Sequence, residues 1–67
     1  MSNPLEVGDI LYDRRAMCHL LLIEPSEYED DDGYTKETWT LLMLETGQYT
    51  WCWEFVLEDT FDFLRVA

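Results

Sequence analysis

The sequence predicts an all-β fold, a small and partly open barrel of five strands with one helical or 3₁₀ turn before the last strand. Three observations lead to this prediction. Short apolar runs alternate with glycine, proline and acidic residues at close spacing. Residues 48–55 carry a large aromatic side chain at every second position, which is the period of a strand. The chain has 67 residues, enough for a single domain over 1–67.

The first half of the chain supplies two strands. Residues 1–6 form a lead-in, followed by a tight turn at Gly8 and a first strand that ends near Tyr12. Residues 16–24 predict a second strand, which we expect Pro25 to stop because proline cannot donate to a β-ladder.

The second half supplies the remaining strands. An acidic loop over 25–36 leads to a third strand at 37–45, and a hairpin turn then leads to the aromatic strand 48–55. We expect one helical or 3₁₀ turn within 54–60 and a last strand at 61–66. Helix is the rival interpretation for 37–44 and 55–64. The alternation of threonine and tryptophan argues against the first helix, and the second is short and lacks an apolar stripe.

The aromatic strand has two interpretations. As the anchor of the core it would bury roughly 150–250 Å² per ring. In that case the barrel is filled by Trp51, Phe55, Ile10, Leu21 and Val56. As a groove, part of the row stands outside and binds an extended or proline-rich peptide, with the acids of 29–32 as a rim that selects basic peptides. The groove candidates are Tyr49 and Trp53, with Trp39 or Tyr12 as extensions.

Short motifs spread over nearly the whole chain resemble a known architecture. They are VGDI at 7–10, ETGQ at 45–48 and WCWE at 51–54, the last followed by Leu57 and Glu58. The pattern resembles small SH3-like β-barrel proteins, often phage-encoded, which begin with VGD and end with G-x-x-x-W-x-x-E-x-x-L. The resemblance implies an SH3-like barrel, a fold that hosts unrelated functions. Basic members bind RNA or DNA through lysine and arginine in the loop between the second and third strands. This chain has acids there, which argues against that activity.

The acidic net charge indicates a binding role rather than catalysis. Fifteen acidic residues stand against four basic ones, for a net charge of −11. Such a chain repels nucleic acid and anionic lipid, so we expect neither as a direct partner. Solubility, or adaptation to a salt-rich host, is the simplest explanation of the acidity. The alternative is an acidic interaction module that docks on a basic protein surface.

Two acidic groups are candidates for that docking surface. The first takes six of nine consecutive positions: Glu24, Glu27, Glu29, Asp30, Asp31 and Asp32. The second follows the aromatic strand: Glu54, Glu58, Asp59 and Asp62. Closely spaced carboxylates beside an aromatic residue imitate a phosphate backbone, so the partner could be a nucleic-acid-binding protein.

A structural role is the second hypothesis. The second strand is apolar on both faces, with Leu20 and Leu22 on one and Leu21 and Ile23 on the other. The third repeats the pattern over 41–44. Curvature and the last strand could cover the outer faces, or a second copy could bury them, since monomers seldom expose apolar patches above a few hundred Å². A homodimer, or a virion component that assembles through these faces, would follow.

The sequence gives little support for a metal site or for covalent catalysis. Asp30, Asp32 and Gly33 fit part of a calcium loop, but Tyr28 and Trp39 occupy its first and last ligand positions. Neighbouring residues on a strand point to opposite faces, which separates the Cys18 and His19 side chains and leaves zinc without a ligand set. We therefore predict no metal, no cofactor, no catalytic residue and no enzymatic activity.

The two cysteines, Cys18 and Cys52, are too few for a disulfide framework. They predict free, buried thiols in a reducing compartment, although a single bridge is the alternative. With no apolar run long enough to span a bilayer, we expect a cytoplasmic protein, in the host cell if it is phage-encoded.

Overall fold

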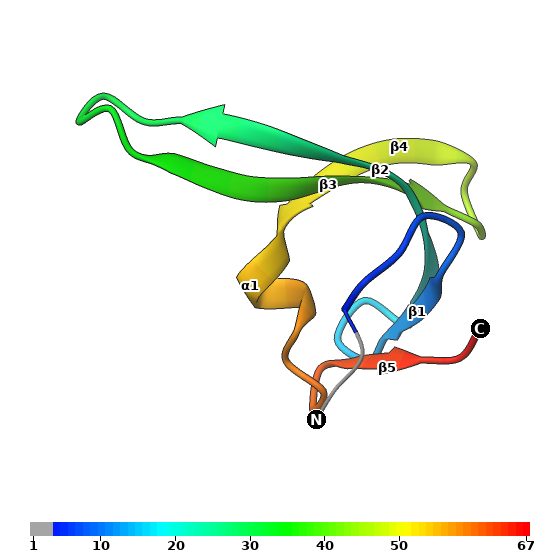
Figure 1. The fold of residues 1–67 in the computed structure, drawn as a ribbon. Helices are drawn as coiled ribbons and strands as arrows, with labels where there is room; N and C mark the ends of the chain where they lie inside the picture. The colour runs from blue at the N-terminus through cyan, green and yellow to red at the C-terminus, as the bar shows by residue number, and fades with distance from the viewer. Residues whose placement is uncertain (1–3) are drawn as a thin grey trace.

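The computed structural model describes residues 4–67 and confirms an all-β domain (Figure 1). The elements are β1 (Ile10–Asp13), β2 (Cys18–Glu29), β3 (Thr35–Met43), β4 (Gln48–Trp53), α1 (Glu54–Leu57) and β5 (Phe63–Arg65). The strands form one antiparallel sheet in the order β4-β3-β2-β1-β5. The five strands and the short helix before the last one are as predicted. The first half of the predicted lead-in 1–6 lies outside the described residues.

The longest strand, β2, contains a β-bulge that sets which side chains face the core. Its pairing with β3 shifts between Leu22 and Glu24, so Ile23 is an extra residue in the ladder. The bulge reverses the alternation of faces. Leu20 and Leu22 point to the inner face, whereas Glu24 lies on the outer face opposite Thr40.

Pro25 does not end β2, contrary to the prediction. The strand runs on to Glu29, with Pro25 in register opposite Trp39. Strand β1 pairs with β2 only up to Leu21. Within residues 4–67 the second edge of β2 therefore has no neighbouring strand at Pro25, where a missing N–H is tolerated.

The segment 25–36 is consequently an arm rather than a loop. Its two sides are the outer halves of β2 and β3, which project beyond the rest of the sheet (Figure 1). The turn at the tip is fixed by Asp30, whose Oδ1 accepts hydrogen bonds from the backbone N–H groups of Asp32 and Tyr34 at 3.0 and 2.9 Å. Gly33 has a φ of 84°, which favours glycine.

The core lies on the concave inner face of the sheet. Its members are buried apolar side chains from five elements: Leu11, Cys18, Leu20, Leu22, Trp39, Leu41, Leu57 and Phe63. Leu57 from α1 and Phe63 from β5 belong to the same buried cluster as Leu11 and Leu22. The helical turn lies within the predicted span, and the last strand is shorter than predicted.

The aromatic strand does not fill the core, so this prediction is wrong. Trp51 and Phe55 are 56% and 65% exposed, and the register explains why. Cys52 lies opposite the buried Trp39, which turns Cys52 inward and Trp51 outward.

Two other members of the predicted core also lie elsewhere. Ile10 and Leu21 are cross-strand partners on the outer face and are half-buried. Only Val56 packs against the core, at its margin.

Both cysteines are free thiols. Cys18 is buried and Cys52 is half-buried. Burial is the largest factor that raises the pKa of each thiol, so both stay protonated at neutral pH and are weak nucleophiles. No helix within residues 4–67 is long and apolar enough to cross a membrane.

Candidate functional site

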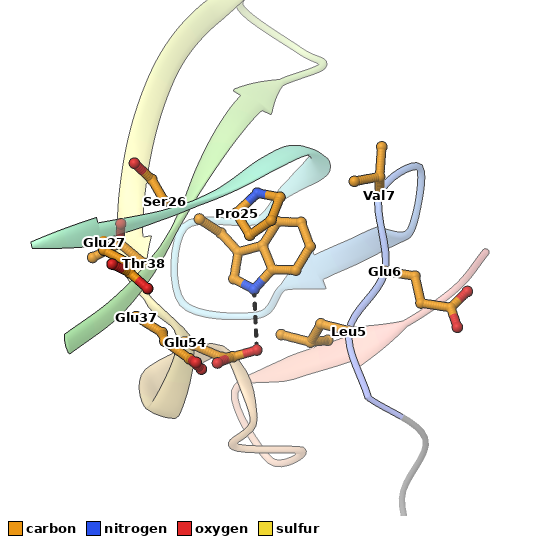
Figure 2. Close-up of a pocket in the computed structure, with 10 residues that line it drawn as sticks. Leu5, Glu6, Val7, Pro25, Ser26, Glu27, Glu37, Thr38 and Glu54 are labelled. Carbon is orange, nitrogen blue, oxygen red and sulfur yellow. Dashed lines mark hydrogen bonds between the residues drawn. The ribbon is translucent and has the colours of Figure 1, made fainter. Parts of the chain in front are cut away.

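An acidic pocket lies at the base of the arm, between the N-terminal segment, β2, β3 and α1 (Figure 2). Its volume is about 640 Å³. It is lined by Leu5, Glu6, Val7, Pro25, Ser26, Glu27, Glu37, Thr38, Trp39 and Glu54. Figure 2 shows Leu5 and Val7 on one side and Glu27, Glu37 and Glu54 on the other, with the Glu6 carboxylate directed away. The pocket therefore joins an apolar wall to a carboxylate wall.

The carboxylate wall gathers Glu27, Glu37 and Glu54 on one side of the acidic pocket. A hydrogen bond with the carboxyl group of Glu54 is the largest factor that raises the pKa of Glu37, and repulsion from Glu54 adds to it. Glu27 and Glu58 raise it further. Neighbouring carboxylates repel one another, so a bound proton or a cation from a partner molecule stabilises them.

The indole of Trp39 fixes the position of this wall. Its Nε1–H donates to Oε1 of Glu54 at 3.3 Å, while the ring itself lies in the core. Glu54 is the first residue of α1, and Glu37 lies two positions before Trp39 on β3. A core residue thus holds one carboxylate beside another.

The first predicted acidic group does not form a single surface. Glu24 lies on the outer face, and Glu27 lines the acidic pocket with Glu29 farther along the same side of β2. Asp30 is a structural residue of the turn, and Asp31 and Asp32 are exposed at the tip.

The residues of the second predicted acidic group also lie in two different places. Glu54 lines the acidic pocket, and Glu58 is close enough to raise the pKa of Glu37. Asp59 and Asp62 lie in the turn before β5 and do not line the pocket. The structure thus brings together Glu27 and Glu54, one from each predicted group.

The outer face carries an aromatic cluster on β2, β4 and α1. The ring of Trp53 contacts Tyr28 and Trp51 edge-on, with centroids 5.5 and 5.1 Å apart. Phe55 stacks on Trp53 at 6.3 Å, and the Lys36 ammonium lies 5.7 Å from the Trp53 centroid. The predicted groove residue Trp53 is half-buried within this cluster.

The other residues predicted for the groove lie apart from one another in the structure. Tyr49 is 69% exposed on the same face, beside Leu42. Tyr12 packs against His19 at 5.0 Å. Trp39 belongs to the core and was wrongly considered for the groove.

A small cavity, the hydroxyl slot, lies between Tyr28 and Trp51 on the outer face. Strand β3 provides Thr38 and Thr40, and β2 provides Ser26 and Glu27. Its volume is about 210 Å³.

Metal ligands do not converge. Within residues 4–67 no group of three or more His, Cys, Asp or Glu side chains is arranged to hold a metal ion. His19 instead pairs with Glu45, with Nδ1 2.6 Å from Oε2.

Two pocket residues, Glu37 and Glu6, were missed in the sequence. Glu37 stands alone at the start of the third predicted strand, outside both acidic runs. Its pairing with Glu54 depends on how α1 packs against β3, which no local pattern reveals. Alternation could have placed Glu37 on the same face as Trp39.

Comparison of the chain with protein-family models, with curated proteins and with solved structures found no match in any of the three.

Proposed function

We propose that this protein is a non-enzymatic acidic interaction module that docks on a basic surface of a partner protein. The acidic pocket and the adjoining arm form the docking surface. The observation that carries the proposal is the carboxylate wall, where Glu27, Glu37 and Glu54 line one side of the acidic pocket. The proximity of Glu54, Glu27 and Glu58 raises the pKa of Glu37. Neither of the two ion pairs among the described residues involves any of these four carboxylates.

A lysine or arginine side chain of the partner would be complementary to both the apolar wall and the carboxylate wall of this pocket. The aliphatic stem would lie along Leu5, Val7 and Pro25, and the charged end would reach Glu37 and Glu54. Binding would relieve the repulsion within the carboxylate wall. The net charge of −11 would accelerate encounter with a basic partner.

The class of partner that we favour is a protein with a basic cleft for nucleic acid. The carboxylates of the arm and pocket would occupy that cleft as phosphate groups do. We place the protein in the cytoplasm, which agrees with two free thiols.

The direct test neutralises the arm. Glu29, Asp31 and Asp32 are exposed, so their replacement by Gln and Asn should leave the fold unchanged. We expect the wild-type protein to capture a partner from cells of its host at low salt and to release it at high salt. The triple variant should capture much less. Equal capture by a folded triple variant would contradict docking through the arm.

A specific observation favours a second candidate function, self-association in a structural assembly such as a virion. An apolar row crosses the outer face of four neighbouring strands in register: Ile10, Leu21, Leu42 and Tyr49. A second copy could bury this row by packing face to face. High salt would strengthen such an apolar contact and would weaken acidic docking.

A further inference from the structure

The hydroxyl slot has a different chemistry from the acidic pocket. Three hydroxyl groups, from Ser26, Thr38 and Thr40, lie between two aromatic rings on the outer face of the sheet. Tyr28 and Trp51 are 52% and 56% exposed, so their rings are open to stacking.

Hydroxyl and carboxylate oxygens accept hydrogen bonds, and ring faces attract cations. The group that satisfies both is flat, positively charged and rich in N–H donors. A guanidinium group has five N–H donors in one plane and stacks on aromatic rings, whereas an ammonium group is compact and strongly hydrated. Glu24, which lies on the outer face opposite Thr40, provides a carboxylate beside the slot for a charge-assisted hydrogen bond.

The neighbouring ring already holds a cation of this chain. The Lys36 ammonium lies over Trp53, at 5.7 Å from its centroid, within the same aromatic cluster. Glu24 lies opposite Thr40 in the register, next to the slot. Charge complementarity therefore selects a basic occupant over an acidic or neutral one.

We propose that the hydroxyl slot binds the guanidinium group of an arginine in the partner protein, stacked on Trp51 and Tyr28. This inference rests on the proposed function and names the side chain that the partner contributes. The acidic pocket would attract any basic segment, and the slot would distinguish arginine from lysine.

Two peptides of equal charge, octa-arginine and octa-lysine, test the slot by isothermal titration calorimetry at low salt. We expect the wild-type protein to bind octa-arginine more tightly. Trp51→Ala should weaken octa-arginine binding roughly 5- to 30-fold, the loss expected for a desolvated cation–π contact. Binding of octa-lysine should remain unchanged. Trp51→Phe keeps a stacking ring and should retain most of the preference, which separates loss of stacking from misfolding.

Tyr49→Ala is the matched control, because Tyr49 is an exposed aromatic residue on the same face of β4 outside the slot. Equal affinity of the wild-type protein for both peptides, or a preference that survives Trp51→Ala, would contradict arginine binding in the slot. Neither result would contradict the proposed function. Failure of both peptides to bind would overturn both. A change in the oligomeric state of Trp51→Ala with an unaltered preference would assign the slot to a second copy and overturn the inference.

Discussion

The indole N–H of Trp39 donates to the carboxylate of Glu54 at 3.3 Å, although the two residues lie in different elements. This bond joins the core to the acidic pocket. Trp39 is 4% exposed, so its geometry is set by packing. The position of Glu54 beside Glu37 thus follows from how the core is filled.

The first prediction concerns that bond. Trp39→Phe keeps an aromatic ring in the core but removes the donor and some volume. We expect the free energy of unfolding to fall by about 2 kcal/mol, as measured by urea denaturation. Trp51→Phe is the matched control and should change it by less than about 0.5 kcal/mol, because Trp51 is exposed. A similar loss in both variants would contradict the assignment of Trp39 to the core.

The second prediction concerns pH. The pKa of Glu37 is raised above 4.5, so the folded state holds this proton more tightly than the unfolded chain. The free energy of unfolding therefore falls as the pH rises from the ordinary glutamate pKa through the raised one. Glu37→Gln removes this loss. Its urea midpoint should exceed that of the wild type at pH 7, and the difference should vanish at about pH 3.5.

Glu29→Gln removes the same charge from the same side of the arm and is the control for this measurement. Glu29 does not contribute to the shift in the pKa of Glu37. An equal gain in both variants would show that general acidity, rather than the contact with Glu54, destabilises the fold.

The third prediction concerns Glu45, whose contribution to stability has the opposite dependence on pH. The backbone N–H of His19 donates to Oε1 of Glu45 at 2.7 Å and is the largest factor that lowers the pKa of Glu45. This stabilisation is present above the ordinary glutamate pKa and is lost as the pH falls through the lowered one. Glu45→Gln should therefore lower the urea midpoint at pH 7, and the difference from the wild type should shrink as the pH falls below the ordinary glutamate pKa. A midpoint unchanged at pH 7 would show that the contact adds no stability.

The fourth prediction belongs to the second candidate function. If the outer row mediates self-association, sedimentation equilibrium should show a dimer that high salt strengthens, and Leu42→Asp should return a monomer. Asp31→Asn, at the tip of the arm, is the control and should remain dimeric. A monomeric wild-type protein at high micromolar concentration would exclude this function.

The number of strands and their succession along the chain could be predicted from the sequence because turns and apolar runs are local. Which side of the aromatic strand faces inward could not. Leucines on both sides of β2 and β3 leave that choice open, and the bulge at Ile23 then decides it. Trp51 is outside because Cys52 lies opposite Trp39.

The candidate site was predicted in part. Glu27 and Glu54 were named from charge density, which is local. Glu37 was missed because it is an isolated acid, and the packing of α1 brings it to Glu54. Pro25 does not terminate β2 because the neighbouring edge of the strand lacks a partner there, which the sequence does not show.

The central claim is that the acidic pocket binds a basic partner. Its most direct test is the affinity for a decalysine peptide at low and high salt, measured by calorimetry for the wild type, Glu37→Gln/Glu54→Gln and Asp59→Asn/Asp62→Asn. Both variants lose the same charge, but only the first alters the pocket. We predict salt-sensitive binding that the first variant weakens by tenfold or more, that is by about 1.4 kcal/mol, while the second changes it little. Equal weakening in the two variants, or none, would contradict the claim.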